Sequence, residues 1–285
     1  DNQINFMAVQ NAHWNDIEIN SYKEKNKIEK DKYNSQIFIP NFFCFGEYEE
    51  DLAKKYNLRI KNIFKYGSIR TANYFRYIKD NNIKLIDNLY DVCLISEPLF
   101  NFNKRYKKNF IEEGVGLLTK YTIQIAKENN LKFVFATKYG KFNGEHIIKK
   151  ELDFYKKLLT EEEFDYLLSN SNIKKNIYSS YDAVFQSKVV IGCHTTLLRD
   201  KIGLRQKILS CNFTDFEILN FPLKGTCSIN SCNYKDFSFR LKNIINEPSD
   251  IFFNEINPKY VMEFDKEISV IKKIRNQINK ILTPK

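Results

Sequence analysis

The segment Val189–Asn212 constrains the fold more strongly than any other part of the chain. It reads VVIGCHTTLLRDKIGLRQKILSCN, which predicts a strand, a turn, a helix, a second turn and a second strand. Gly192 ends the first apolar run and allows a sharp turn. Thr195 and Thr196 then open a helix that Gly203 closes. A strand that leads directly into a helix is typical of an α/β sheet.

The helix start in this segment is a predicted anion site. Backbone N–H groups in the first turn of a helix have no partner within the helix, and the helix dipole favours negative charge at that end. Ligands of open α/β sheets also bind at the carboxyl ends of strands. An ordinary structural αβ unit, in which Thr195 serves only as a helix cap, explains the local pattern equally well.

Strands and helices alternate along the rest of the chain, which predicts an α/β fold. Further strands are expected at Ile4–Gln10, Gln36–Pro40, Asn62–Tyr66, Tyr90–Ser96, Leu131–Thr137 and Cys227–Asn230. Further helices are expected at Gly46–Tyr56, Asn109–Glu128, Glu145–Leu159, Thr160–Leu168, Ile177–Gln186, Tyr234–Asn246 and Phe264–Leu282. Thr160 and Glu163 have the spacing of a capping box.

Composition and missing motifs exclude several classes of protein. The six cysteines are scattered without a C-x-x-C pair and the three histidines are far apart, so we expect no metal site and a reducing cytosol. The sequence has no G-x-G-x-x-G dinucleotide motif, no G-x-x-x-x-G-K-[ST] motif and no G-x-S-x-G nucleophile motif. No apolar run approaches the roughly twenty residues of a membrane-spanning helix.

The chain is basic, with a formal net charge of +10. Lysines are spread along the sequence rather than gathered in a block, and no nucleic-acid-binding motif accompanies them. We therefore expect no nucleic-acid partner. The charge favours anionic partners such as nucleotide sugars, phosphorylated glycans or an anionic membrane surface.

Four short motifs, in this order along the chain, carry a resemblance to a known family. They are V-Q-N at Val9–Asn11, G-S-I-R at Gly67–Arg70, D-V-C-L-I-S at Asp91–Ser96 and G-C-H-T-T-L-L at Gly192–Leu198. Together they resemble GT-B glycosyltransferases of bacterial surface-carbohydrate biosynthesis, of the capsule and lipopolysaccharide type and similar to Kdo transferases. The resemblance implies two Rossmann-like domains.

Three parts of the chain follow from this resemblance and from the pattern, which restarts near residue 85. Residues 1–84 are expected to form the acceptor-side domain, residues 85–263 the nucleotide-sugar domain, and residues 264–285 a helix that packs back on the first domain. The sequence begins at Asp1 without a methionine, and its first residues read as the middle of a domain. We therefore expect the N-terminal domain to be incomplete.

The resemblance also assigns candidate site residues. Those expected to bind the donor are Ser96, Lys138, His194, Thr195, Thr196 and Arg199, and those expected in the acceptor cleft are Gln10, Asn11, Gly67, Ser68 and Arg70. The candidate catalytic carboxylates are Asp1 and Glu113. Relatives have an acidic residue where this chain has Arg199-Asp200, so which of the two faces the ligand is open.

Ordinary structural roles compete with several of these assignments. Lys138 fits a solvated surface lysine as well as a phosphate contact. A carboxylate at Glu112 or Glu113 favours the helix dipole without any catalytic role. Gly67 and Ser68 fit a plain strand-to-helix turn.

The implied reaction is metal-independent glycosyl transfer, without a cofactor, from a nucleotide-activated donor to a glycan or glycolipid acceptor. A CMP-linked ulosonic acid such as Kdo is the expected donor, and a UDP- or GDP-sugar is the second candidate. A CDP-polyol phosphotransferase of the teichoic-acid type and a non-catalytic glycan- or nucleotide-binding module remain alternatives. The expected location is the cytoplasm, including the inner face of the membrane.

Overall fold

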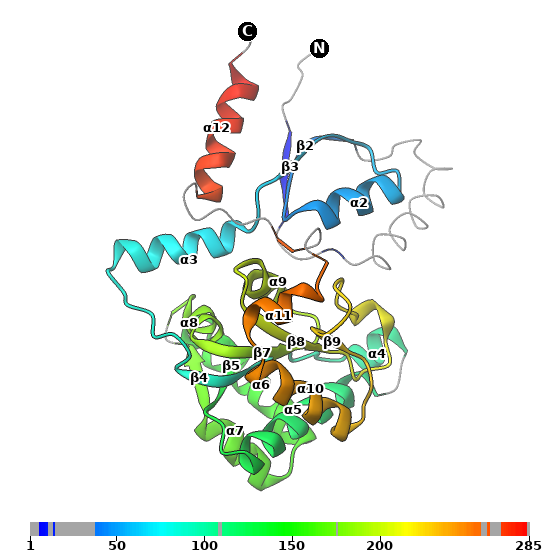
Figure 1. Cartoon of the computed structure of the whole chain (residues 1–285), viewed down its shortest axis with the longest axis vertical. Coiled ribbons are helices and arrows are strands. Elements are labelled where there is room, and N and C mark those ends of the chain that lie inside the picture. Colours follow the sequence, from blue (N-terminus) through cyan, green and yellow to red (C-terminus); the bar gives the residue numbers. More distant parts are fainter. Residues whose placement is uncertain are drawn as a thin grey trace. The chain divides into compact units, whose positions relative to one another are not determined.

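A computed structural model describes residues 6–10, 14, 38–107, 110–174, 176–257, 261–262 and 269–283. The chain divides into two compact units (Figure 1). Unit 1 comprises Asp1–Ile83 and Asn257–Lys285, and unit 2 comprises Lys84–Ile256.

Unit 1 contains a three-stranded parallel sheet in the order β1-β2-β3. The described residues of this unit form the strands β1 (Met7–Val9), β2 (Ile39–Cys44) and β3 (Ile60–Lys65) and the helices α2 (Glu47–Lys55), α3 (Ile69–Asp80) and α12 (Val270–Leu282). Helix α12 packs against α3, and the Tyr66 hydroxyl donates a hydrogen bond to Gln277 Oε1 at 3.5 Å. The two ends of the chain therefore contribute to one unit.

Strand β2 lies later in the sequence than the predicted strand Gln36–Pro40. Its buried residues are Phe42, Phe43 and Cys44, which follow the predicted end of the strand. Asn41 is also buried and accepts a hydrogen bond from Asn62 Nδ2 on β3 at 3.0 Å. Burial of the two phenylalanines thus determines where this strand runs.

Unit 2 contains a six-stranded parallel sheet in the order β6-β5-β4-β7-β8-β9. Its strands are β4 (Tyr90–Ile95), β5 (Phe133–Gly140), β6 (Ser171–Lys174), β7 (Ser187–Gly192), β8 (Lys207–Cys211) and β9 (Ser228–Ile229). Its helices are α4 (Phe102–Tyr106), α5 (Ile111–Glu128), α6 (Glu145–Leu158), α7 (Glu161–Ser169), α8 (Ser179–Phe185), α9 (Thr196–Gly203), α10 (Tyr234–Asn246) and α11 (Ser249–Asn254). The α/β class is confirmed in both units.

The chain adds strands to the larger sheet in two opposite directions, starting from β4 at its centre. From β4 the chain adds β5 and then β6 on one side, whereas β7, β8 and β9 follow one another on the other side. Helices α5, α6, α7 and α10 pack together in one layer and α8 packs against α9 in another, with the sheet between them (Figure 1). The carboxyl ends of β4 and β7 therefore lie side by side, while the connections that follow them lead to α5 on one face and to α9 on the other.

The segment Val189–Asn212 folds as predicted, into β7, α9 and β8. Val189, Val190 and Ile191 are fully buried between neighbouring strands. The helix ends at Gly203, but the left-handed residue beyond it is Arg205, with φ 57°. Gly203 therefore closes the helix without the left-handed conformation that a C-terminal glycine usually supplies.

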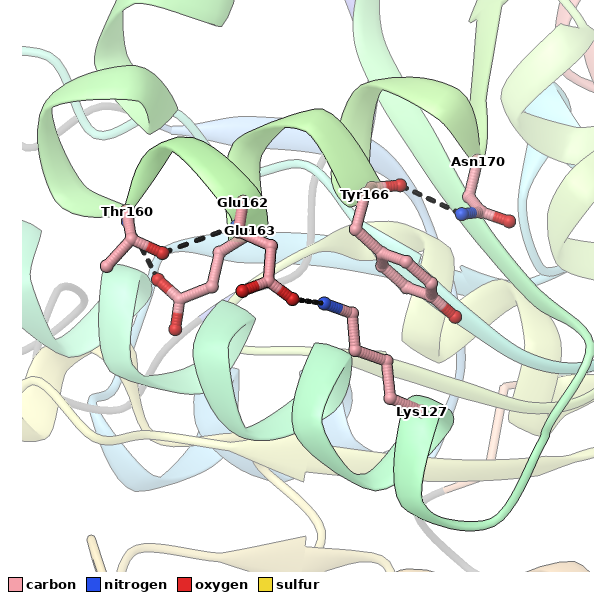
Figure 2. Close-up of polar contacts among 6 residues, drawn as sticks. All are labelled: Lys127, Thr160, Glu162, Glu163, Tyr166 and Asn170. Atoms are coloured by element: carbon pink, nitrogen blue, oxygen red, sulfur yellow. Dashed lines mark hydrogen bonds and ion pairs between the residues drawn. The ribbon is translucent and has the colours of Figure 1, made fainter.

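Helix α7 begins with the predicted capping box (Figure 2). Thr160 Oγ1 accepts a hydrogen bond from the Glu163 N–H at 3.3 Å, and Glu163 Oε2 accepts one from the Thr160 N–H at 2.8 Å. Lys127 of α5 forms a 2.7 Å ion pair with Glu162 and lies over the Tyr166 ring. An exposed ion pair of this kind contributes little to the free energy of unfolding. It lies where α5 and α7 are in contact.

Among the α-helices and strands of the described residues, α3, α4, β6 and α11 had no sequence prediction. Strand β6 has four residues at the edge of the sheet, and α4 has five residues with none fully buried. Short elements with little buried apolar surface leave no clear periodicity in a sequence.

Candidate functional site

The carboxyl ends of β4 and β7 form the strongest candidate site in unit 2. In open α/β sheets, ligands bind in the crevice where the strand order reverses. Ser96 and Glu97 follow β4, and residues 192–196 end β7 and lead into α9. We call these two segments the switch site.

Glu97 connects the two sides of the switch site. Its carboxylate accepts hydrogen bonds from the backbone N–H groups of Cys193 and His194, the latter at 2.7 Å. The anion that this loop holds is therefore a side chain of the protein itself. Two of the N–H groups just before α9 are already bonded and are not available to a ligand in this arrangement.

Gly192 is needed for the close approach of Glu97. A Cβ atom at this position would lie 3.2 Å from Glu97 Oε2 and 3.0 Å from Thr195 Cγ2. The sequence predicted that Gly192 allows a sharp turn. Its backbone is not left-handed, so a turn that only glycine can adopt does not explain this residue. Lack of a side chain, rather than backbone freedom, is what this position uses.

The electrostatics of the switch site follow from burial. Burial raises the pKa of the Glu97 carboxyl, while the two N–H groups and the charge of Lys138 act in the opposite direction. Burial lowers the pKa of His194 to about 4, against a hydrogen bond to the Leu219 carbonyl. His194 is therefore neutral at neutral pH and supplies hydrogen bonds rather than positive charge. Lys138 was predicted to bind the donor. It is exposed on β5, and its positive charge acts on Glu97 at this edge of the sheet.

Glu151 of α6 supports the site from behind, and no sequence prediction included it. It is fully buried and accepts hydrogen bonds from the Lys138 N–H at 2.7 Å and the Tyr139 N–H at 2.9 Å. The hydroxyl of Ser96 also donates to Glu151. Ser96 is buried, so its predicted contact with a donor is replaced in this structure by a contact with the protein interior.

Tyr155, one helical turn after Glu151, completes this support. Its hydroxyl accepts a hydrogen bond from the Glu97 N–H at 2.8 Å and lies 3.2 Å from Ser96 Oγ. Burial raises the pKa of Tyr155, which keeps the phenol protonated. The sequence held one signal for this pair: Glu151 falls in the middle of the apolar stripe of a helix, where a carboxylate needs partners.

The first turn of α9 contains the two predicted threonines. Thr195 is the N-cap, and its hydroxyl accepts a hydrogen bond from the Leu197 N–H at 3.3 Å. Thr196 is the first residue of the helix, and both threonines are partly exposed. Arg199 and Asp200 are both buried, and Asp200 accepts a hydrogen bond from the Tyr181 hydroxyl at 3.4 Å. Neither side chain of the Arg199-Asp200 pair lies at the surface.

Glu113 is exposed in the first turn of α5. Its Oε2 accepts a hydrogen bond from Asn103 Nδ2 at 3.0 Å. The same turn of α5 is anchored to the switch site, because Ile111 and Cys193 belong to one buried cluster with Leu219. The start of α5 and the loop before α9 are therefore neighbours.

Two predicted acceptor residues, Gln10 and Ser68, make hydrogen bonds in the interior of unit 1. Gln10 is buried; its Oε1 accepts from the Phe45 N–H at 2.8 Å and its Nε2 donates to Glu49 at 3.2 Å. Gly67 is left-handed, with φ 86°, and Ser68 is buried as the N-cap of α3. The side chain of Arg70, by contrast, is exposed.

Two predicted site residues, Asp1 and Asn11, lie outside the described residues. Within the described residues, no group of three or more His, Cys, Asp or Glu side chains could hold a metal ion. Five cysteines are buried and Cys232 is exposed, all as free thiols. None of the helices in the described ranges has both the length and the apolar character needed to cross a membrane.

No family model matches the chain, and no curated protein matches its sequence. Several solved structures are similar to it, and the following are three of them. UDP-GlcNAc 2-epimerase from Neisseria meningitidis, bound to UDP-GlcNAc, has 13% identity and a TM-score of 0.45 over 81% of this chain and 58% of that chain. A glycosyltransferase from Rickettsia africae ESF-5 has 10% identity and a TM-score of 0.40 over 98% and 71%.

The wall teichoic acid polymerase TagF has 11% identity and a TM-score of 0.40 over 93% of this chain and 63% of that chain. This chain thus spans less than two thirds of the lengths of the epimerase and the polymerase. The strands themselves establish the architecture: an α/β protein with one parallel sheet in each unit.

Proposed function

We propose that this chain is a glycosyltransferase that binds a nucleotide-activated donor at the switch site. One observation carries the proposal: the strand order of unit 2 reverses between β4 and β7, and a helix N-terminus follows β7 at that reversal. A reversal of this kind creates a ligand crevice in open α/β sheets, and a helix N-terminus favours phosphate.

The proposed donor contacts take account of Glu97. Since Glu97 already accepts from the N–H groups of Cys193 and His194, we assign the donor phosphate to the hydroxyls of Thr195 and Thr196 and to the charge of Lys138. Neutral His194 contributes a hydrogen bond in this proposal. Ser96 and Arg199, both buried, become positioning residues.

The proposed chemistry needs a stabilised leaving nucleotide and an activated acceptor hydroxyl. The first turn of α9 and Lys138 serve the leaving group. Glu113 is the proposed general base: it is exposed, and its helix begins beside the loop of Cys193. Asp1 stays the second candidate base, and Arg70 is the exposed candidate for an acceptor contact.

The identity of the substrates rests on the family resemblance of the sequence motifs. We propose a CMP-linked ulosonic acid such as Kdo as the donor, a UDP- or GDP-sugar as the second choice, and a surface glycan as the acceptor, without a metal. A non-catalytic nucleotide-binding module is the second candidate function. It is favoured because Gln10 and Ser68, which were predicted to lie in the acceptor cleft, make hydrogen bonds within unit 1. A CDP-polyol phosphotransferase would use the same donor site.

A thermal-shift panel of CMP, CDP, UDP and GDP tests the donor site, because a ligand that binds only the folded protein raises its melting temperature. We expect one nucleotide to stabilise the protein and the Thr195→Ala/Thr196→Ala variant to lose that stabilisation. Thr226→Ala, also partly exposed in unit 2, is the matched control. No shift with any nucleotide would contradict the proposal.

Turnover then separates the candidate functions. Transfer or hydrolysis of the stabilising donor, lost in Glu113→Gln, supports the enzyme. Nucleotide binding without turnover supports the binding module.

A further inference from the structure

Helix α12 combines an apolar arc with several cationic residues. Its sequence, VIKKIRNQINKIL, contains four cationic residues and no acidic one. The cationic residues are Lys272, Lys273, Arg275 and Lys280, and the apolar residues are Val270, Ile271, Ile274, Ile278, Ile281 and Leu282. At about 100° per residue, the apolar side chains fall within an arc of about 120° and the cations lie outside it.

Contacts within unit 1 cover one edge of this apolar arc. Val270, on that edge, is 2% exposed, and the adjacent Gln277 accepts the hydrogen bond from Tyr66. The opposite edge of the arc is open: Leu282 is 57% exposed, and Ile271 and Ile278 are partly exposed. Packing on α3 therefore accounts for only part of the apolar surface of α12.

The helix on which α12 packs adds to the positive charge. Helix α3 has three basic residues, Arg70, Arg76 and Lys79, against the single acidic residue Asp80. Arg70 and Lys79 are exposed, while Arg76 pairs with Asp80 at 3.3 Å. The two packed helices therefore carry an excess of basic residues, which favours an anionic partner.

We propose that α12 docks on an anionic lipid bilayer. The helix lies in the plane of the interface, with the edge of Ile271, Ile278 and Leu282 at the acyl boundary. Lys272 and Arg275, the cations nearest to that edge around the helix, lie on the lipid phosphates. With 13 residues it is shorter than the roughly twenty that a membrane span requires. An anionic polymer such as a nucleic acid would match the charge but would leave the apolar edge without a partner.

Co-sedimentation of the full chain with lipid vesicles tests this proposal. We expect the protein to pellet with vesicles of equal parts phosphatidylcholine and phosphatidylglycerol, and not with phosphatidylcholine alone. Added salt should weaken the binding, because screening reduces the attraction between exposed charges. Lys272→Glu/Arg275→Glu should lower the affinity about thirty-fold or more, since each basic residue near an anionic surface contributes to binding.

Two matched controls separate this helix from general effects of charge and exposed apolar groups. Lys149→Glu/Lys156→Glu makes the same change in net charge at exposed positions on α6. Leu282→Asp should weaken vesicle binding, whereas Phe239→Asp should not, although Phe239 of α10 is 70% exposed. Both Asp variants replace exposed side chains, so both should fold, and circular dichroism checks this.

Three outcomes would overturn the proposal. One is the absence of pelleting with anionic vesicles. Another is an equal loss of binding in the α6 and α12 charge variants, which would indicate an effect of net charge. The third is full binding by Leu282→Asp together with loss in Lys272→Glu/Arg275→Glu, which would indicate a polyanion site without an apolar contact.

Discussion

Two turns in this molecule share a sequence pattern and differ in what they do. In unit 1, β3 leads through Gly67 and Ser68 into α3, and in unit 2, β7 leads through Gly192 and Thr195 into α9. Both hydroxyls cap their helices, Ser68 by accepting from the Thr71 N–H and Thr195 by accepting from the Leu197 N–H, each at 3.3 Å. The local helix-start signal is therefore the same in both.

The difference lies in the glycines and in a neighbouring strand. Gly67 is left-handed, so backbone freedom is what it supplies. Gly192 leaves space for Glu97, which enters from β4 and bonds to the loop. The turn in unit 1 is thus a cap, whereas the turn in unit 2 is part of a site where two strands meet. A strand–glycine–hydroxyl pattern predicts a helix start, and only the adjacent strand decides whether it becomes a site.

Removing the carboxylate should produce the largest difference between the two turns. Glu97→Ala leaves the N–H groups of Cys193 and His194 without their acceptor, and we expect a loss of about 2–3 kcal/mol in the free energy of unfolding. Glu97→Gln, which keeps one acceptor oxygen, should lose less. Urea denaturation measures both, and a loss below that of Ser68→Ala would show that Glu97 does not hold the loop.

The two glycines should respond differently to asparagine. Ala at either position should cost about 1–2 kcal/mol, by strain of the left-handed backbone at Gly67 and by crowding of Glu97 and Thr195 at Gly192. Asn adopts the left-handed conformation more readily than Ala, so it should recover stability at Gly67 and lose more at Gly192. Melting temperatures of the four variants test this, and equal recovery at both positions would remove the distinction.

The two caps should be alike in stability and unlike in function. Ser68→Ala and Thr195→Ala should each cost about 1 kcal/mol, the usual value for an N-cap hydroxyl. Only Thr195→Ala should also weaken nucleotide binding, because the other cap lies in unit 1. Isothermal titration of the stabilising nucleotide decides this, and equal affinities in the two variants would refute a role for the α9 turn.

A pH dependence of stability, which His194 gives to the turn of unit 2, is a further difference between the two turns. The pKa of His194 is about 4 when folded, below its ordinary value of 6.5, so the unfolded chain binds more protons between these values. The free energy of unfolding should therefore rise as the pH increases from about 4 to 6.5. His194→Gln should remove this part of the slope. If the dependence of the free energy of unfolding on pH is unchanged in that variant, the pKa of His194 is not lowered in the folded protein.

Local sequence patterns predicted those elements whose signals lie within a few residues. The Thr160–Glu163 capping box, the helix after Thr195 and the buried run Val189–Ile191 all depend on neighbours in the chain, and all are confirmed. Strand β2 was placed too early because the segment Gln36–Pro40 is as apolar as Phe42 and Phe43, and the burial of these two phenylalanines does not show in the sequence. Among the helices and strands without predictions, α4, β6 and α11 are short, whereas α3 has 12 residues and its buried residues are Thr71, Ala72 and Tyr74.

The site required information of longer range. Glu97 bonds to Cys193 across 96 residues of sequence, and Glu151 meets Ser96 across 55. No local pattern specifies such partners, although a carboxylate in the apolar stripe of α6 indicates that one exists. For the same reason, burial of Ser96 and Arg199 was not foreseen.

The sequence by itself determined the α/β alternation, the helix that starts at Thr196 and its threonine cap, because hydrophobic periodicity and capping act between near neighbours. Only the tertiary structure decided that β4 lies beside β7, and hence that Glu97 occupies the loop before α9. Strand order depends on which apolar surfaces are buried together, and that choice involves the whole chain.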